Sequence, residues 1–453
     1  MNKIATSLFS ALLLVVVCSI NCEAQRKGDL PSPRAPQRQR VTSVDQLLPN
    51  ARLLVRRPFS WMVGGQYGLG LKKGEKLLVM AADMDPLIAE AVAMAADEIG
   101  VKADVMSRDT SAIVARRGRN EFDYERFNPA TYMAGTNTVA RAMPDWLEKA
   151  VDNYDVILGY TARGTHYGKL GKNLTVRSAG LIWTTAEQFA SPAAGYPDEL
   201  MGAIASRAWQ VLIRGHKFRM TDPMGTDISF SIDTINLERF KETRGMSTYG
   251  QKSLEHPLAN ESSLQLEPQL SGKPDTRGVL VSKQVGLMPV IRIYFQSGQV
   301  TRIEGGGAPG ENIRQAFERS KTVQYPGHYP GPGIGWVEEM ALGTHPKVGP
   351  AGPLRHRSGL IQVAFGTDRH NTVSDALPAL PTHHRDMDLF YYPTLEVDGK
   401  KLVDRGRLTT LDDPEVRRIA AKYGNPDELL REDWIPKFEE SSGRIVYPKY
   451  PGE

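Results

Sequence analysis

Between residues 70 and 107 the chain carries first a strand pattern, then a helix pattern, then a second strand pattern. "KLLVMAA" (76–82) is a short apolar run that predicts a buried strand. "PLIAEAVAMAADEIG" (86–100) has apolar residues at helical spacing and ends on Gly100, and "KADVMS" (102–107) predicts another strand. Strand, helix and strand in this order form a βαβ unit, so we expect an α/β domain with a parallel sheet. "YDVILGYT" (154–161) and "DELMGAIASRAWQVLIRG" (198–215) extend it with a strand and a helix.

From about residue 217 the apolar positions alternate with polar ones. "HKFRMTDPMGTDISFSID" (216–233) predicts a hairpin around its Pro-Met-Gly turn. "GVLVSKQ" (278–284), "PVIRIYFQSGQVTRIEGGG" (289–307) and "GLIQVAFG" (359–366) predict further strands, with a turn at Ser297–Gly298. The expected fold is therefore an α/β domain over 44–215, followed by a β-rich α+β domain over 216–453.

The N-terminus predicts a secretion signal over residues 1–24. Lys3 precedes an apolar run from Leu8 to Cys18, and small residues around Ala24 allow cleavage there. Residues 25–43, rich in Pro, Arg and Gln, predict a linker. We expect a secreted or periplasmic protein without a membrane span in the mature chain, because the apolar run is shorter than the ~20 residues that cross a bilayer.

Charge and cysteine content narrow the possible partners and ligands. The 52 acidic residues nearly match the 56 basic ones, and no block of like charge argues for nucleic acid. Both cysteines, Cys18 and Cys22, lie in the predicted signal. Any metal in the mature chain must therefore be held by His, Asp and Glu, which suit zinc, cobalt, manganese or iron(II).

The segment "LPTHHRDMDLFYYP" concentrates possible ligands. His383, His384, Asp386 and Asp388 fall within six positions, and six of the nine histidines lie between 328 and 384. In an extended segment His384 and Asp386 point the same way and can reach one ion. Three protein ligands and one open position suit a catalytic metal.

A carboxylate from another strand, Glu338 or Glu339, could complete the ligand set, and His345 is a further candidate. An H-x-D pair also occurs by chance, so surface hydrogen bonding by these residues stays an alternative. The chain has neither the G-x-S-x-G elbow of serine hydrolases nor an HExxH motif. "TDPMGTD" is interpreted as a structural turn or as a wall of a substrate cleft.

Taken together, these stretches resemble the metal-dependent aminopeptidases of the aminopeptidase T type. The resemblance runs from about Gly64 to Leu408 and includes "KKGEKLLV", "TDPMGTDISF", "EEMALGT", "VAFG" and "HRDMDLF". It implies an α/β domain, a β-rich domain, a homodimer and a buried two-metal site. The family's metal ligands match Glu339, His384 and Asp386.

Two departures from the family pattern put the second metal in doubt. Gln362 stands where the family has a metal-binding histidine, and a neutral amide is a poor ligand for zinc or cobalt. The family's "PxGE" glutamate has no counterpart, with Glu255 and Glu261 as loose substitutes. Arg369 falls near a family tyrosine thought to assist catalysis.

The chain is also similar to 2,5-dihydroxypyridine 5,6-dioxygenase, which holds iron(II) with two histidines and an aspartate. His384 and Asp386 match that set, and His345 would have to supply the other histidine. The expected function is a secreted metal-dependent aminopeptidase acting on short peptides. Glu338, or a carboxylate within 255–261, would be the general base, and Arg369 would stabilise the oxyanion. An iron(II) ring-cleaving dioxygenase with a small-molecule substrate, and a non-catalytic ligand-binding descendant, are the alternatives.

Overall fold

The computed structural model describes a little over half of the chain. The described residues are 40–59, 68–81, 84–106, 153–158, 176–179, 181, 185–232, 253–254, 263–266, 274–282, 290–324, 329–333, 335–348, 357–366, 384–389, 392–432, 437–439 and 444–446. Of the predicted segments, the signal and all of the linker before residue 40 lie outside them. Among the described helices, none has both the length and the apolar character needed to cross a membrane.

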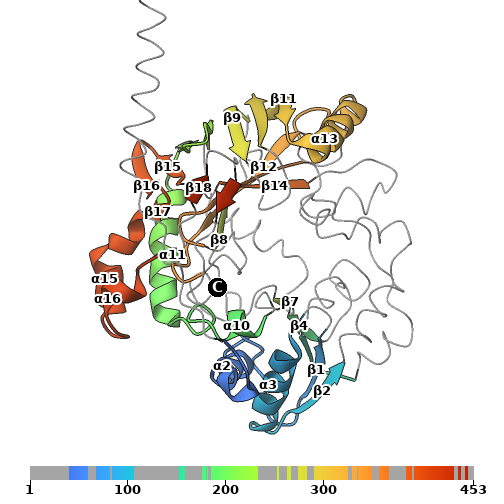
Figure 1. The fold of residues 1–453 in the computed structure, drawn as a ribbon, viewed down its shortest axis with the longest axis vertical. Coiled ribbons are helices and arrows are strands. Elements are labelled where there is room, and N and C mark those ends of the chain that lie inside the picture. Colours follow the sequence, from blue (N-terminus) through green and yellow to red (C-terminus); the bar gives the residue numbers. More distant parts are fainter. Residues whose placement is uncertain are drawn as a thin grey trace, which may run out of the picture.

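Five parallel strands form one sheet, in the order β2-β1-β3-β4-β7 (Figure 1). The strands are β1 (Lys76–Met80), β2 (Lys102–Met106), β3 (Val156–Leu158), β4 (Arg177–Ala179) and β7 (Ser253–Leu254). The predicted βαβ unit is confirmed, because β1 and β2 pair in parallel and α3 (Pro86–Asp97) connects them along the chain. Asp85 caps α3 by accepting a hydrogen bond from the amide of Leu87, and Pro86 fills the first helical position.

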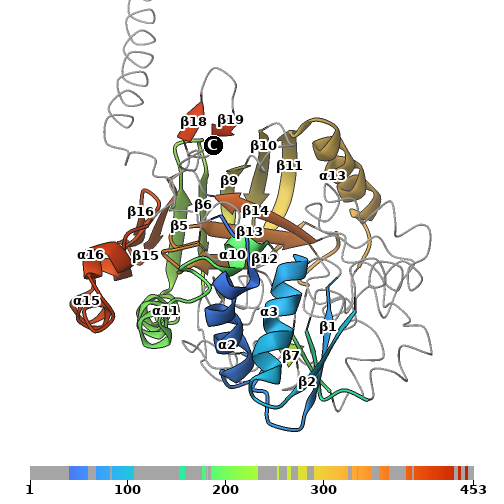
Figure 2. The same cartoon turned by 60° about the horizontal axis from the view of Figure 1, so that its bottom comes forward.

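Short helices complete this part of the chain: η1 (Val44–Gln46), α2 (Leu48–Arg56) and α10 (Ala186–Phe189). Helices α2 and α3 lie side by side, and their apolar faces join the core of the parallel sheet (Figure 2). Val41 is buried in that core. The packed region therefore includes a residue that we assigned to the linker, because Val41 is apolar and adjoins the first helical turn.

The second sheet is mainly antiparallel and has twelve strands, in the order β14-β13-β12-β11-β10-β9-β6-β5-β15-β16-β17, with β8 also paired to β12. The strands are β5 (Lys217–Thr221), β6 (Asp227–Ser231), β8 (Ser263–Leu266), β9 (Arg277–Ser282), β10 (Ile291–Gln296), β11 (Gln299–Gly305), β12 (Trp336–Gly343), β13 (Ile361–Gly366), β14 (His384–Leu389), β15 (Thr394–Val397), β16 (Lys400–Asp404) and β17 (Arg407–Leu408). The sheet curls, so that β14 comes back towards β9. Further elements are α11 (Asp198–Leu212), α13 (Gly307–Ser320), η5 (Thr409–Asp412), α15 (Pro414–Ala420), α16 (Pro426–Leu429) and the separate pair β18 (Lys437–Glu439) and β19 (Arg444–Val446).

Both predicted hairpins form. Strands β5 and β6 pair antiparallel across the Pro-Met-Gly turn, where buried Asp222 accepts hydrogen bonds from the amides of Met224 and Thr226. Strands β10 and β11 meet at Ser297 and Gly298, both with positive φ, as a tight two-residue turn between antiparallel strands requires. "TDPMGTD" is thus a turn closed by its own aspartate.

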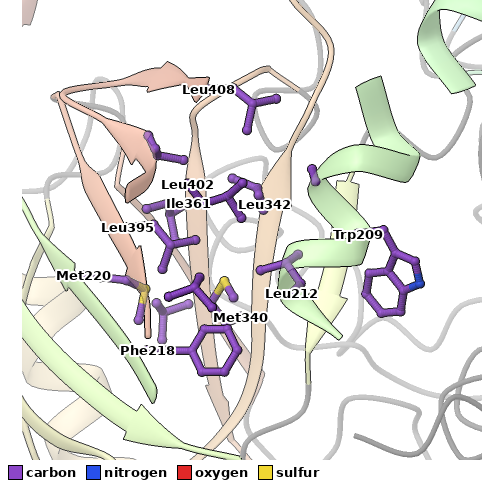
Figure 3. Packing of buried hydrophobic residues seen from close by; sticks show 14 of the residues in the cluster. Trp209, Leu212, Phe218, Met220, Met340, Leu342, Ile361, Leu395, Leu402 and Leu408 are labelled. Atoms are coloured by element: carbon purple, nitrogen blue, oxygen red, sulfur yellow. The ribbon is translucent and has the colours of Figure 1, made fainter. Parts of the chain in front are cut away.

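The largest core lies within the antiparallel sheet and includes α11 (Figure 3). Trp209 and Leu212 of α11 belong to the same cluster as Met340 of β12 and Ile361 of β13. The helix that we assigned to the α/β domain therefore packs on the β-rich core, because its buried side chains meet that sheet. Conversely, β7 belongs by sequence to the expected β-rich domain (216–453), but it pairs with β4 of the parallel sheet.

Candidate metal site

Strands β12, β13 and β14, which contain Glu338, Glu339, His384, Asp386 and Asp388, are neighbours in the antiparallel sheet (Figure 2). All residues of β12 and β13 are buried. Strands covered on both faces accept long apolar runs, which explains "MALG" and "IQVAFG". The polar exceptions inside this buried pair are Glu338, Glu339 and Gln362, which are 0%, 4% and 5% exposed.

The strand register places Glu339 and Asp386 in one row. Glu339 of β12 lies opposite Ala364 of β13, and Ala364 lies opposite Asp386 of β14. Neighbouring strands are about 4.8 Å apart, so the Cα atoms of Glu339 and Asp386 are separated by roughly 10 Å. The residue between them carries only a methyl group. The register therefore places a buried glutamate and an aspartate in the same row of the sheet, on either side of Ala364.

The adjoining rows add the other predicted residues. Along β14, His384 is opposite Gly366 and Asp388 is opposite Gln362. Because every second residue of a strand occupies the same side, positions 384, 386 and 388 belong to the side of Glu339. The intervening residues of β13, Val363 and Phe365, belong to the apolar core. One side of these three strands thus carries the hydrophobic core, and the other carries the polar set. Asp388 lies within strand β14.

A β-bulge separates the two adjacent glutamates. The register shifts between Val337 and Glu339, so that Glu338 is the extra residue on β12. The hydroxyl of Tyr329 donates a 2.5 Å hydrogen bond to Oε1 of Glu338. A general base has to accept a proton from substrate or water, whereas this oxygen accepts a hydrogen bond from a protein hydroxyl. In this arrangement Glu338 is engaged with the protein, and we do not retain it as the base.

His345 lies at the end of the same segment but has both ring nitrogens engaged. Nε2 is 3.1 Å from the carbonyl oxygen of Ala193, and Nδ1 accepts a hydrogen bond from the amide of Lys347. The ring is fully buried and packs against the ring of Tyr196, with 4.8 Å between the two ring centroids. Burial lowers the pKa of His345 to about 4, against the hydrogen bond to Ala193, which raises it, and the nearby Lys347 charge adds a smaller lowering. This arrangement leaves no lone pair for an ion, so His345 is omitted from the ligand set.

The remaining predicted site residues lie outside what the structure describes. They are Arg369, His383, Glu255 and Glu261, together with the side chains of His384, Asp386 and Asp388. Among the side chains that are described, no group of three His, Cys, Asp or Glu gathers around one point. The backbone register of β14 and the buried side chain of Glu339 are therefore the two features of the structure that favour a shared site.

The bulge and Tyr329 were missed by sequence reasoning. Adjacent glutamates in a buried strand are the one signal that could have indicated the bulge, because only one of two successive residues can face each side. No pattern in the sequence singles out Tyr329.

The sequence matches no protein-family model and no curated protein. Two solved structures have a similar fold. A 2,5-dihydroxypyridine dioxygenase from Pseudomonas putida is 13% identical, with a TM-score of 0.43, over 83% of this chain and 99% of that one. Wild-type AmpT from Thermus thermophilus is 14% identical, with a TM-score of 0.42, over 80% of this chain and 99% of that one. Likeness at this level is a distant fold relationship, and the function has to be argued from the residues of this chain.

Proposed function

We propose that this protein is a metal-dependent hydrolase that removes N-terminal residues from short peptides. The observation that carries the proposal is the row in which Glu339, Ala364 and Asp386 lie opposite one another on neighbouring strands. His384 is two residues before Asp386 on β14 and therefore occupies the same side of the sheet. Glu339 is almost completely buried, and charges inside proteins are paired or bind metals. The two carboxylates and one imidazole would hold a single divalent ion.

The donor set suits zinc, manganese or cobalt, because two carboxylate oxygens and one imidazole nitrogen leave room for water and substrate. An ion bound there would polarise a carbonyl group and lower the pKa of water. Asp388, two residues along β14 from Asp386, is the carboxylate that we assign to take the proton from water. Arg369 keeps the oxyanion-stabilising role proposed from the sequence.

The iron(II) dioxygenase is the less favoured candidate. It needs two histidines in its ligand set, and His345 was the residue expected to supply the second one. With both ring nitrogens of His345 engaged by Ala193 and Lys347, that second histidine is missing from the proposed set. Two carboxylates and one histidine favour Lewis-acid chemistry over redox chemistry.

The metal content of the purified full-length or naturally processed protein tests the proposal. We expect one divalent ion per chain, lost in His384→Ala and retained in His216→Ala. His216 is a matched control because its ring contacts the carbonyl of Ile232, away from β12 to β14. Absence of a bound ion under metal-replete conditions would refute the proposed site.

Activity is then measured on short peptides with free and with acetylated N-termini. Cleavage of the free peptides alone supports an aminopeptidase. We expect Asp388→Asn to keep the ion and to lose at least about 100-fold in kcat, as removal of a general base does. Oxygen uptake with a hydroxylated pyridine, together with bound iron, would establish the dioxygenase instead.

A further inference from the structure

The bulge in β12 decides which glutamate reaches the proposed metal site. Before the bulge, Val337 is opposite Phe365, and both belong to the hydrophobic core. After it, Met340 is opposite Val363, and both again belong to the core. Regular alternation cannot place Val337 and Met340 on the same side, because they are three residues apart. The extra residue, Glu338, solves this conflict.

Without the bulge, the strand beyond Val337 would slip by one residue. Glu338 would then lie opposite Ala364, and Glu339 would turn towards the core. A slip of one residue moves every following side chain to the other face. The bulge therefore keeps Met340 and Leu342 in the core and places Glu339 in the row of Ala364 and Asp386.

A hydrogen bond from outside the sheet holds the bulged residue. Tyr329 donates its 2.5 Å hydrogen bond to Glu338, whose side chain has no solvent exposure. Hydrogen bonds to a carboxylate are short and strong, and a buried carboxylate depends on them. Tyr329 itself packs against Ala316 of α13, as does Phe317 of the same helix. The helix thus supports Tyr329, and Tyr329 fixes Glu338 at the point where the register shifts.

We infer that Tyr329 is a positioning residue for the metal site, acting through Glu338 and the bulge on Glu339. The inference rests on the proposed function, since it assumes that Glu339 binds an ion. It assigns Tyr329 and Glu338 no contact with substrate. Their role is to keep the Glu339 carboxylate over Ala364, where it can share an ion with Asp386.

The test compares two tyrosine–glutamate hydrogen bonds whose glutamates lie on strands of the same sheet. Tyr329→Phe removes the hydroxyl that bonds Glu338. Tyr294→Phe is the matched control, because Tyr294 donates a 2.8 Å hydrogen bond to Glu304 on the pair β10–β11, away from the site. Binding of Mn²⁺ or Zn²⁺ to the metal-stripped full chain is measured by calorimetry, and the thermal midpoint is followed in parallel.

We expect Tyr329→Phe to weaken metal binding by roughly 10- to 100-fold, as loss of partners behind the direct ligands does, and Tyr294→Phe to leave it unchanged. Glu338→Gln keeps an oxygen acceptor for Tyr329 and should bind metal nearly as well as the natural chain. Glu338→Leu lacks the acceptor and should resemble Tyr329→Phe. In the Glu338→Leu background, Tyr329→Phe should add little, because both changes break one contact.

The outcomes separate the two proposals. If the natural chain binds no ion, the proposed function fails, and the role of Tyr329 fails with it. If the natural chain binds an ion and Tyr329→Phe binds it equally well, only the positioning role is overturned. Fully additive losses from Tyr329→Phe and Glu338→Leu would also overturn it, because Tyr329 would then act by a route other than Glu338.

Discussion

Two buried titratable residues show how burial shifts the pKa in opposite directions for a base and for an acid. Burial lowers the pKa of His345 to about 4, since the charged imidazolium is disfavoured. Burial raises the pKa of Asp222 to about 6, against the hydrogen bonds that it accepts from Thr226 and Met224. His345 thus stabilises the fold when neutral, whereas Asp222 stabilises it when protonated.

The pH dependence of unfolding should reveal the neutral state of His345. Its pKa is about 4 in the fold and about 6.5 when unfolded, so its stabilising contribution is complete above pH 6.5. As the pH falls towards 4, roughly 3 kcal/mol of the free energy of unfolding is lost. The stability gap between the natural chain and His345→Leu should therefore shrink from about pH 7 to pH 4.

Urea unfolding of both proteins at several pH values measures that gap. The contribution of Asp222 has the opposite sign, being lost as the pH rises from about 4 to about 6, and it cancels because both proteins contain Asp222. A gap that stays constant across this range would contradict the neutral, buried His345.

At the scale of elements, turns determine where the site strands begin. Gly359 immediately precedes β13 and has a φ of +75°, and a Cβ there would lie 2.0 Å from the carbonyl oxygen of Gly406. Gly399, in the turn between β15 and β16, has a similar φ of +77°, but a Cβ there would meet nothing within 4 Å. Both glycines have a positive φ, but only Gly359 has a backbone atom in the way of a Cβ. Comparing them therefore distinguishes the cost of the backbone conformation from the cost of a steric clash.

Alanine substitution at these two glycines should have unequal costs. Gly399→Ala should lower the free energy of unfolding by about 1 to 2 kcal/mol, the cost of a left-handed conformation. Gly359→Ala should cost a further 1 to 3 kcal/mol or so, because a backbone atom blocks the methyl group. Denaturant unfolding measures both changes, and equal losses would contradict the close approach of Gly406 to Gly359.

At the scale of the whole molecule, hydrogen bonds between distant segments hold β12 in place. His345 contacts Ala193 before α11, and the hydroxyl of Tyr196 donates to the carbonyl of Leu429. Lys347 donates from Nζ to the carbonyl of Arg431. The loop after β12, the segment before α11 and the C-terminal region therefore meet around one histidine, which gives His345 a structural role.

Metal binding should couple to the stability of β14. This strand ends the described strand order, and only β13 pairs with it among the described strands. An ion shared by Glu339, His384 and Asp386 would tie β14 to β12, and binding to the folded state alone stabilises it. Removal of metal with a chelator should therefore speed hydrogen exchange of residues 384–389 more than that of β10. Equal exchange with and without metal would contradict a ligand set that includes β14.

Local patterns in the sequence predicted several of the longer elements that the structure describes. Helical spacing predicted α3 and α11, and alternation predicted the hairpins β5–β6 and β10–β11, because these periodicities follow from the geometry of each element alone. The residue types at Glu339, His384 and Asp386 indicated metal chemistry, because carboxylates and imidazoles are metal ligands wherever they occur in a chain. The predicted parallel sheet is confirmed, and the roles of these three residues stay predictions.

Only the tertiary structure decided how those residues are arranged. Glu338 and Glu339 are chemically identical neighbours, and the bulge alone assigns one to Tyr329 and the other to the row of Asp386. The engagement of His345 depends on Ala193, which is 152 residues away in the chain. Register and long-range pairing arise from the packing of a whole core, which no short stretch of sequence encodes.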